Sequence, residues 1–143
     1  MKNIALSLMA TAMLVGSSGS ALAQDVIDNY GGVVTLQKGD GPILECEVGV
    51  SLNYTTNKAS LAIIPLDDED PCRTIIITSN LHNFSDISSV VTISAVYANT
   101  TITPGDCFGN LVLAKGSGTL TASSATLPQV SSGGSCVING TVF

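Results

Sequence analysis

From residue 43 to residue 54 the chain alternates between apolar and polar side chains, and this alternation constrains the fold more than any other feature. The apolar positions are Leu44, Cys46, Val48, Val50, Leu52 and Tyr54. Glu45 and Glu47 lie at intervening positions. Because successive side chains of a strand point to opposite faces of a sheet, this spacing of two predicts a β-strand with one buried face.

Shorter strand patterns follow one another through the rest of the chain. They cover residues 33–37, 60–64, 74–78, 86–98, 110–115, 119–126 and 136–143. Val91, Ile93 and Ala95 share the face expected to be buried in the segment 86–98. In the last segment, Ile138 and Val142 share that face.

These patterns predict an all-β fold. No segment after residue 23 has the 3.6-residue period of an amphipathic helix, and about eight short strands separated by turns are typical of a sandwich or a barrel. We expect a single antiparallel β-sandwich over residues 24–143, because the strands of a two-sheet sandwich alternate one face inward and one face outward.

The first 23 residues have the parts of a secretory signal peptide. Lys2 supplies an early positive charge, residues 4–15 are almost wholly apolar, and residues 21–23 read Ala-Leu-Ala. The apolar run is shorter than the ~20 residues of a membrane-spanning helix, and small residues at its end fit a cleavage site better than an uncleaved anchor. We therefore expect a signal peptide at residues 1–23 and a secreted, extracellular or cell-surface domain at residues 24–143.

The expected export of this domain determines how its cysteines are interpreted. The chain has four cysteines, Cys46, Cys72, Cys107 and Cys136. An even number in a short exported chain indicates disulfides, whereas a zinc site needs closely spaced pairs and these cysteines are 26, 35 and 29 residues apart. Three pairings are possible. We expect Cys46–Cys72 and Cys107–Cys136, because cysteines that are neighbours in sequence often lie in adjacent strands.

Acidic residues outnumber basic ones in this chain. It has 11 Asp and Glu residues against five Lys and Arg, a formal net charge of −6 at pH 7. A nucleic-acid-binding domain needs basic side chains to neutralise phosphates, and anionic membrane surfaces also attract basic segments. We therefore expect no nucleic-acid partner and no attraction to anionic membrane surfaces. For the mature chain, residues 24–143, we also expect no integral membrane segment.

Few residues could carry catalysis. His82 is the only histidine, no Gly-x-Ser-x-Gly turn surrounds a serine, and the segment around His82 suggests a solvated loop. Glu45 and Glu47 fall on one strand face, whereas glycoside hydrolysis needs two carboxylates that flank the scissile bond. No cofactor-binding motif is present either. We expect no enzymatic activity, no catalytic residue and no cofactor.

An acidic run is the densest charge of the sequence. It consists of Asp67, Asp68, Glu69 and Asp70. Carboxylates attract hard cations, which makes the run a weak calcium candidate. Its spacing differs from a calcium loop, which alternates ligands around a central glycine. Pro65 and Pro71 bracket the run, so we favour a solvated hairpin tip without a metal.

The surroundings of the cysteines form a recognisable pattern. Cys46 lies in an alternating strand pattern, and Cys72 follows a turn. Residues 105–109 read Gly-Asp-Cys-Phe-Gly, and residues 134–140 read Gly-Ser-Cys-Val-Ile-Asn-Gly. In these contexts the chain resembles the exported "protein activator of alkane oxidation" family of the PraA and PraB type, over most of residues 24–143. The resemblance implies an extracellular, non-enzymatic protein that helps cells to contact or use water-insoluble hydrocarbons. The acidic run departs from that family's pattern.

Three functions follow, in order of preference. We expect an extracellular surface-active or matrix protein that assists cell contact with or use of hydrophobic substrates. Its expected partners are other copies of itself or a hydrophobic interface. The first alternative is a subunit of an extracellular filament or adhesin, in which residues 24–38 insert into a neighbouring copy by strand addition, unless they pair within their own sheet. The second alternative is a secreted module that binds calcium or sugar.

We predict that the exported protein begins at Gln24, because an Ala-x-Ala site is cleaved after its second alanine. N-terminal mass analysis of the exported protein measures this. Replacing Ala23 by phenylalanine should block cleavage, whereas Leu22→Phe changes the unrestrained middle position and should leave it intact. An exported protein that still begins at Met1 would contradict the prediction.

Overall fold

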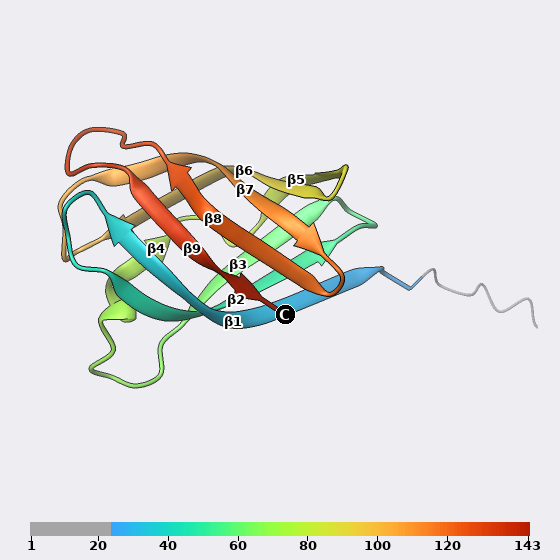
Figure 1. Ribbon diagram of the computed structural model, residues 1–143, viewed down its shortest axis with the longest axis horizontal. Helices are drawn as coiled ribbons and strands as arrows, with labels where there is room; N and C mark the ends of the chain where they lie inside the picture. The colour runs from blue at the N-terminus through green and yellow to red at the C-terminus, as the bar shows by residue number, and fades with distance from the viewer. Residues whose placement is uncertain (1–23) are drawn as a thin grey trace, which may run out of the picture.

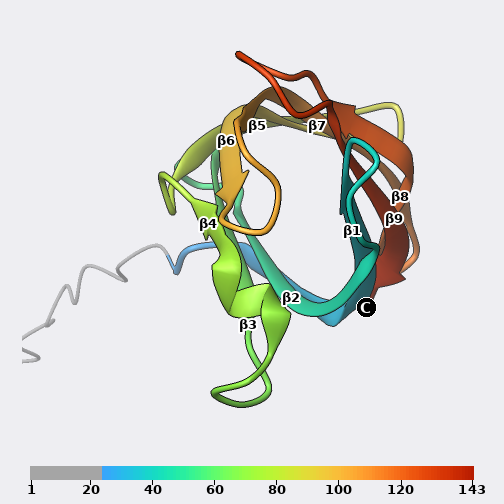
Figure 2. The same ribbon diagram turned by 90° about the vertical axis from the view of Figure 1, so that its left-hand side faces the viewer.

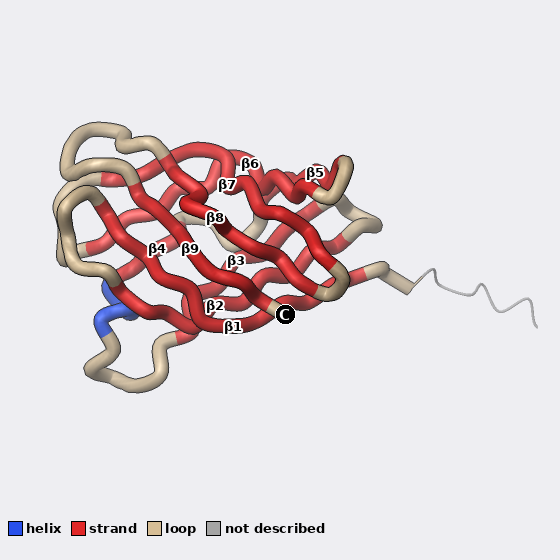
Figure 3. Tube along the Cα trace, in the orientation of Figure 1, coloured by secondary structure: helices blue, strands red, loops and turns tan. Residues whose placement is uncertain are grey.

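The computed structural model describes residues 24–143, so the expected signal peptide at residues 1–23 lies outside the described part. The described residues form nine strands and one short 3-10 helix (Figure 1, Figure 3). In chain order these are β1 (Ile27–Lys38), β2 (Leu44–Asn53), β3 (Lys58–Ile64), η1 (Pro71–Thr74), β4 (Ile75–Ile77), β5 (His82–Ile87), β6 (Val90–Thr100), β7 (Asp106–Gly116), β8 (Thr119–Leu127) and β9 (Cys136–Val142). The all-β prediction is confirmed for these residues. Among them, no helix is long and apolar enough to cross a membrane.

The strands close into an eight-stranded antiparallel barrel, which Figure 2 shows as a ring. Around the ring the order is β1, β2, β3, β5, β6, β7, β8 and β9, and β9 then pairs with β1. The ladder between β6 and β7 runs from Val90 opposite Ala114 to Asn99 opposite Asp106. This ladder joins the two ends of what would otherwise be an open sheet.

The expected β-sandwich is therefore wrong. In a small barrel every strand also has one face directed inward and one directed outward, so the alternation that favoured a sandwich fits a barrel equally well. The two folds differ in whether the first and last strands of the sheet pair with each other. The alternation within a single strand does not encode that pairing.

The ring is weakest between β3 and the position shared by β4 and β5. β5 pairs with the first part of β6, and β4 pairs with its last part, so β4 and β5 share one position in the ring. β3 pairs with β5 only at Lys58 and Ala59. Within the described residues, the remainder of β3, residues 60–64, has ladder partners in β2 alone. Backbone hydrogen bonds therefore do not join this part of β3 to β4.

Apolar side chains fill the inside of the barrel. The largest fully buried side chains are Leu52, Ile93, Leu120, Leu127 and Val91, together with the disulfide-bonded Cys46, Cys72 and Cys107. Burial of each large aliphatic side chain contributes roughly 1.5–3 kcal/mol. The predicted inner face of β2 is confirmed, because Cys46, Val50 and Leu52 are buried. The inner face of β9 is confirmed as well, because Val142 is buried and Ile138 packs against the core.

Both predicted disulfides are present. Cys46–Cys72 joins β2 to η1, and Cys107–Cys136 joins the starts of β7 and β9. The Cα atoms of the two pairs are 5.7 Å and 5.9 Å apart, which is the ordinary separation for a disulfide. Two such bonds are compatible with an extracellular protein.

Two predictions fail where ordinary residues adopt positive φ. Residues 86–98, predicted as one strand, belong to β5 and β6, which are joined by a turn at Ser88 and Ser89 with φ of 54° and 62°. Consecutive positive φ values are typical of the type I′ hairpin turn, which usually carries Asn-Gly. Ala95 has a φ of 55° at a bulge. Ala95 is therefore exposed, and Val96 takes the buried position instead.

The first strand is longer than the sequence predicted. β1 covers residues 27–38 rather than 33–37, and it pairs with β2 along one side and with β9 along the other. The arm that strand addition would use, residues 24–38, therefore lies largely within the chain's own sheet.

We predict that Cys136→Ser lowers the free energy of unfolding by about 2–5 kcal/mol, because it removes a native disulfide from a small domain. Urea denaturation without reducing agent measures the change. Cys107→Ser should have the same effect, because it removes the same disulfide. The double variant should therefore be little less stable than either single variant. Unfolding midpoints equal to that of the wild type would show that this disulfide does not stabilise the barrel.

Candidate functional site

The barrel contains an apolar cavity of about 120 Å³. Its aliphatic wall includes Val34, Leu36, Leu44, Val50, Leu61, Ile63, Ile75, Ile77, Ala98, Ile102, Leu111, Leu113, Leu120, Ala122, Leu127, Ile138 and Val142. The interior of an eight-stranded barrel is just wide enough to be filled by side chains or to hold one small ligand. Apolar cavities of about 150 Å³ stay dry and bind benzene. The cavity therefore suits a small apolar molecule or part of a larger one.

Four connections lie together at one end of the barrel, which we call the mouth (Figure 1). They are residues 39–43, 65–74, 101–105 and 128–135. Consecutive antiparallel strands reverse direction, and the connections consequently alternate between the two ends. The polar residues of the cavity wall also belong to this end, and they are Gln37, Lys38, Asn99, Thr100 and Thr103. The cavity is thus apolar inside and polar at the mouth.

Lys38 supplies a buried charge at the mouth. It is the last residue of β1, continues the inward row of that strand and is only 5% exposed. Its ammonium donates hydrogen bonds to three backbone carbonyl oxygens, those of Thr103, Pro104 and Gly105. The distance is 3.2 Å to Thr103 and 2.5 Å to Gly105. Within residues 24–143, no carboxylate lies within 4.0 Å of this ammonium. Backbone carbonyl dipoles therefore provide its closest polar partners.

Close backbone packing around Lys38 requires glycine at position 133. Gly133 has a φ of 83°, and a Cβ there would lie 1.9 Å from the carbonyl oxygen of Pro104 and 3.0 Å from Lys38 Nζ. The connection between β8 and β9 consequently meets the connection between β6 and β7 at backbone contact distance. Together they cover the Lys38 ammonium.

A polar and aromatic cluster closes the opposite end of the barrel. Lys115 donates hydrogen bonds to the Tyr54 hydroxyl at 2.7 Å and to the Asp86 carboxylate at 2.6 Å. The Tyr54 hydroxyl donates to Asp86 at 3.0 Å. The Tyr54 ring lies 4.9 Å from the Lys115 ammonium, and meets the Phe84 ring edge-on at 5.3 Å between centroids. None of these four residues lines the cavity.

The contacts of this cluster shift the ionisation of its charged groups. The hydrogen bond from Lys115 holds the pKa of Asp86 below its ordinary value, although burial opposes part of that shift. The hydrogen bonds to Asp86 and Tyr54 raise the pKa of Lys115. Lys115 and Asp86 therefore form an ion pair throughout the neutral pH range.

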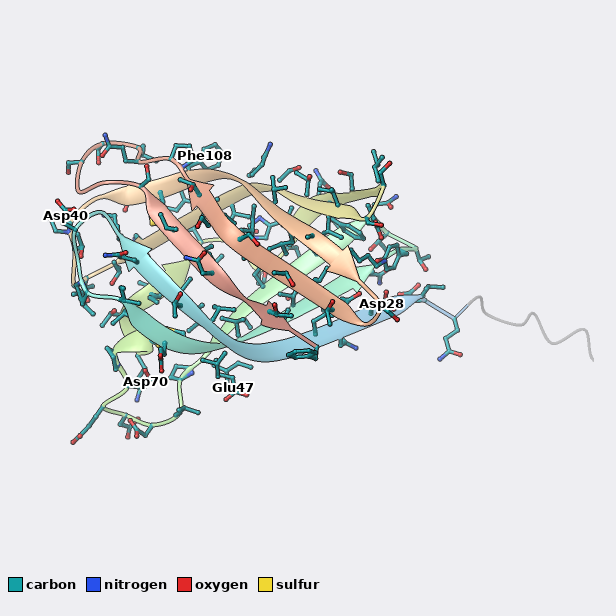
Figure 4. The ribbon with its side chains drawn as sticks, viewed as in Figure 1. Asp28, Asp40, Glu47, Asp70 and Phe108 are labelled. Atoms are coloured by element: carbon teal, nitrogen blue, oxygen red, sulfur yellow. A yellow bond between two sulfur atoms is a disulfide. The ribbon has the colours of Figure 1, made fainter. Side chains whose placement is uncertain are left out.

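Asp70 is the last residue of the acidic run that the sequence indicates as a calcium candidate, and its carboxylate makes local hydrogen bonds. Its carboxylate accepts hydrogen bonds from the backbone N–H groups of Leu66 and Cys72, each at 2.8 Å, and so caps the start of η1 (Figure 4). These two hydrogen bonds lower the pKa of Asp70. The side chain thus stabilises the turn that carries Cys72.

The other acidic residues of this run also make local contacts. Asp67 accepts a hydrogen bond from the backbone N–H of Glu69 at 2.9 Å, and Asp68 forms an ion pair with Arg73. In the part of the chain that the structure describes, no group of three or more His, Cys, Asp or Glu side chains is placed to hold a metal ion.

The remaining residues that the sequence singled out lie away from the cavity wall. Glu45 and Glu47 lie on the outer face of β2, as expected, and Figure 4 shows Glu47 projecting from it. His82 begins β5, is 4% exposed, and its Nε2 lies 2.7 Å from the carbonyl oxygen of Ser79. The expectation of a solvated loop histidine is therefore wrong. β5 is hard to recognise because polar residues occupy most of its positions.

Comparisons with known proteins assign no family. No protein-family model, no curated protein and no solved structure matches this chain. The function of the cavity is therefore inferred from its own geometry and chemistry.

Sequence reasoning missed both Lys38 and the cavity. Lys38 stands two residues after Leu36 and four after Val34, so the alternation that predicted β2 could also have placed it inward. The predicted first strand ends at residue 37, so Lys38 falls just outside it. The cavity wall combines strands that are far apart in sequence, and no local pattern encodes such an arrangement.

We predict that acid destabilises the barrel partly through Asp86. Because its pKa is depressed in the folded state, its ionised form contributes stability above its unfolded pKa of about 3.9, and that contribution is lost as the pH falls through the lower folded value. Asp86→Asn should lower the free energy of unfolding at pH 7 by about 1.5–3 kcal/mol. Below pH 5, the free energy of unfolding of this variant should depend less steeply on pH than that of the wild type.

Urea denaturation between pH 7 and pH 2.5 measures this effect. Asp40→Asn is the control, because it makes the same change at a side chain that is exposed at the mouth (Figure 4), and it should leave the free energy of unfolding at pH 7 close to that of the wild type. The same acid-induced loss of stability in Asp86→Asn and the wild type would contradict the role given to Asp86.

Proposed function

We propose that the protein is an extracellular, non-enzymatic binder of small apolar molecules, which assists cells in contacting or using hydrophobic substrates. The observation that carries this proposal is the apolar cavity inside the barrel. Binding sites for small molecules are typically concave, mostly apolar and largely preformed, with a few polar groups that fix the orientation of the ligand. The aliphatic wall and the polar mouth of this cavity correspond to that description.

The size of the cavity limits what it can enclose. Its volume of about 120 Å³ is somewhat below that of apolar cavities that accept benzene, about 150 Å³. Sites for drug-sized molecules measure about 300–1,000 Å³. We therefore propose that the barrel holds a short hydrocarbon, or one end of a longer hydrocarbon whose remainder extends through the mouth.

Exposed apolar side chains at the mouth support action at a hydrophobic surface. They include Ile43, Ile64, Leu66, Ile102 and Val130. These residues come from the connections at the mouth or from the strand end that leads into them. Apolar groups gathered in one region of a surface often mark a contact site. A barrel whose mouth rests on an oil droplet or a hydrophobic solid would present its cavity directly to the substrate.

The composition of the cavity wall supports binding rather than catalysis. Among the described residues that line it, none is an acid or a histidine. General acid–base catalysis needs such a group within hydrogen-bond reach of the reacting atoms. Lys38, the one charged residue of the wall, donates hydrogen bonds to three carbonyl oxygens, and an ammonium has no lone pair with which to accept a proton. We propose that the bound molecule leaves the barrel chemically unchanged.

We predict that the wild type binds benzene and that Ala122→Leu weakens binding about tenfold or more. Ala122 is buried in the cavity wall, so the added carbon atoms occupy space that benzene would use. An NMR titration of the methyl signals measures the affinity. Ala114→Leu is the control, because it makes the same change at an exposed position of β7 and should leave the affinity unchanged.

Thermal unfolding of both variants verifies that the barrel remains folded. A wild-type protein whose methyl signals do not respond to benzene up to its solubility limit would contradict the proposed function. Equal affinities of Ala122→Leu and the wild type would place the binding site outside the cavity.

A further inference from the structure

We propose that the preferred ligand is a short alkyl carboxylate, with its hydrocarbon tail in the cavity and its carboxylate at Lys38. This inference rests on the proposed function, since it assigns a chemical class to the molecule that the same cavity binds. It depends on three features of the mouth, which are the direction of the Lys38 side chain, the lack of a nearby carboxylate among residues 24–143 and the arrangement of polar groups in the wall.

The Lys38 side chain points into the barrel. Alternate residues of β1 face inward, and Val34, Leu36 and Lys38 form the last part of this row. All three residues line the cavity. An ammonium group therefore stands at the end of an aliphatic wall, which is the arrangement that a molecule with an apolar tail and a charged head requires.

A comparison with Lys115 shows what Lys38 lacks. Both lysines lie near an end of the barrel and direct their side chains inward. Lys115 forms an ion pair with Asp86 at 2.6 Å, whereas no carboxylate of residues 24–143 lies within 4.0 Å of Lys38. Carbonyl dipoles satisfy the hydrogen bonds of a buried cation, but they do not cancel its charge. Because buried charges are strongly stabilised by an opposite charge, a ligand anion would supply what the chain omits.

The polar part of the cavity wall identifies the head group. Gln37, Thr100 and Thr103 lie in the wall at the same end as Lys38. The Gln37 amide already donates to the carbonyl oxygen of Gly41 at 3.1 Å, and the Thr100 hydroxyl pairs with that of Thr74 at 3.0 Å. The Thr103 hydroxyl belongs to the residue whose carbonyl oxygen lies 3.2 Å from the ammonium, and it can donate a hydrogen bond to an anion that has reached this group. A single ammonium matches the single negative charge of a carboxylate. A phosphate monoester, with a charge of about −1.5 to −2 near neutral pH, would remain partly unpaired.

The hydrogen bonds of Lys38 also indicate where the carboxylate enters. The longest of them, at 3.2 Å, reaches the carbonyl oxygen of Thr103, which belongs to the exposed connection between β6 and β7. A carboxylate oxygen can replace this carbonyl at the ammonium, and water can then hydrate the displaced carbonyl at the mouth. The hydrogen bonds to Pro104 and Gly105 hold the ammonium in place during this exchange.

Three probes with the same tail test the inference. They are hexanoate, 1-hexanol and hexylammonium, titrated at pH 7 into the wild-type protein with NMR detection. We expect hexanoate to bind about tenfold more tightly than hexanol, and hexylammonium to bind least tightly. The Lys38→Met variant should lose the preference for hexanoate and keep its affinity for hexanol within about twofold.

Two further variants make the test specific. Lys38→Arg keeps the positive charge and should retain the preference for hexanoate. Lys58→Met removes an exposed lysine that is bonded to Asn83 outside the cavity wall, and should leave all three affinities unchanged. If Lys38→Met does not fold, the order of the three probes in the wild type and in Lys38→Arg still decides the question.

The outcomes separate this inference from the proposed function. Hexanol binding as tightly as hexanoate to the wild type, or an unchanged preference in a folded Lys38→Met variant, would overturn the role of Lys38 and leave an apolar binding site intact. Failure of all three probes and of benzene to bind would overturn the proposed function itself.

Discussion

Closure of the sheet is the constraint on which the rest of the structure depends, because the ladders of β6 with β7 and of β1 with β9 together turn a nine-stranded sheet into a closed ring. Without it, the sheet would have two open edges and its apolar face would need a second layer to cover it. With it, one curved sheet encloses its own core. The bulge at Ala95 lies within β6, and it keeps Val96 inside the barrel after the register has shifted.

The two ends of the barrel are built differently, and this difference gives the molecule a direction. At one end the Lys115–Asp86 ion pair and the ring of Tyr54 complete the packing of the core. At the mouth, β3 and β4 are not joined by a backbone ladder among the described residues, and Lys38 is surrounded by carbonyl groups rather than by an acid. The cavity reaches the mouth, where Lys38, Thr100 and Thr103 belong to its wall, whereas Lys115, Asp86 and Tyr54 at the opposite end do not line it.

The features that the sequence predicted are those that a single strand or a cysteine pattern can encode. Alternation identified β2 and its buried face, and the cysteine order identified both disulfides. The hairpin at Ser88 and Ser89 was missed because serine seldom adopts positive φ, so the turn carries no sequence signal. Closure of the ring, and with it the cavity, depends on which distant strands pair. The proposed head-group site required this tertiary information, and the inward position of Lys38 was missed because the predicted first strand ends at residue 37.

The pairing of β1 with β9 has a consequence for how the protein folds. Residue 34 pairs with residue 140, so the first and last strands of the ring are neighbours in space while nearly the whole domain lies between them in sequence. Contacts of such long range carry a large loop-closure entropy and slow the folding of β-proteins. The hairpins between consecutive strands can form earlier, but a chain that has only these hairpins is an open sheet. The cavity has no complete wall until the two strands meet, so the capacity to hold a ligand arises together with the finished barrel.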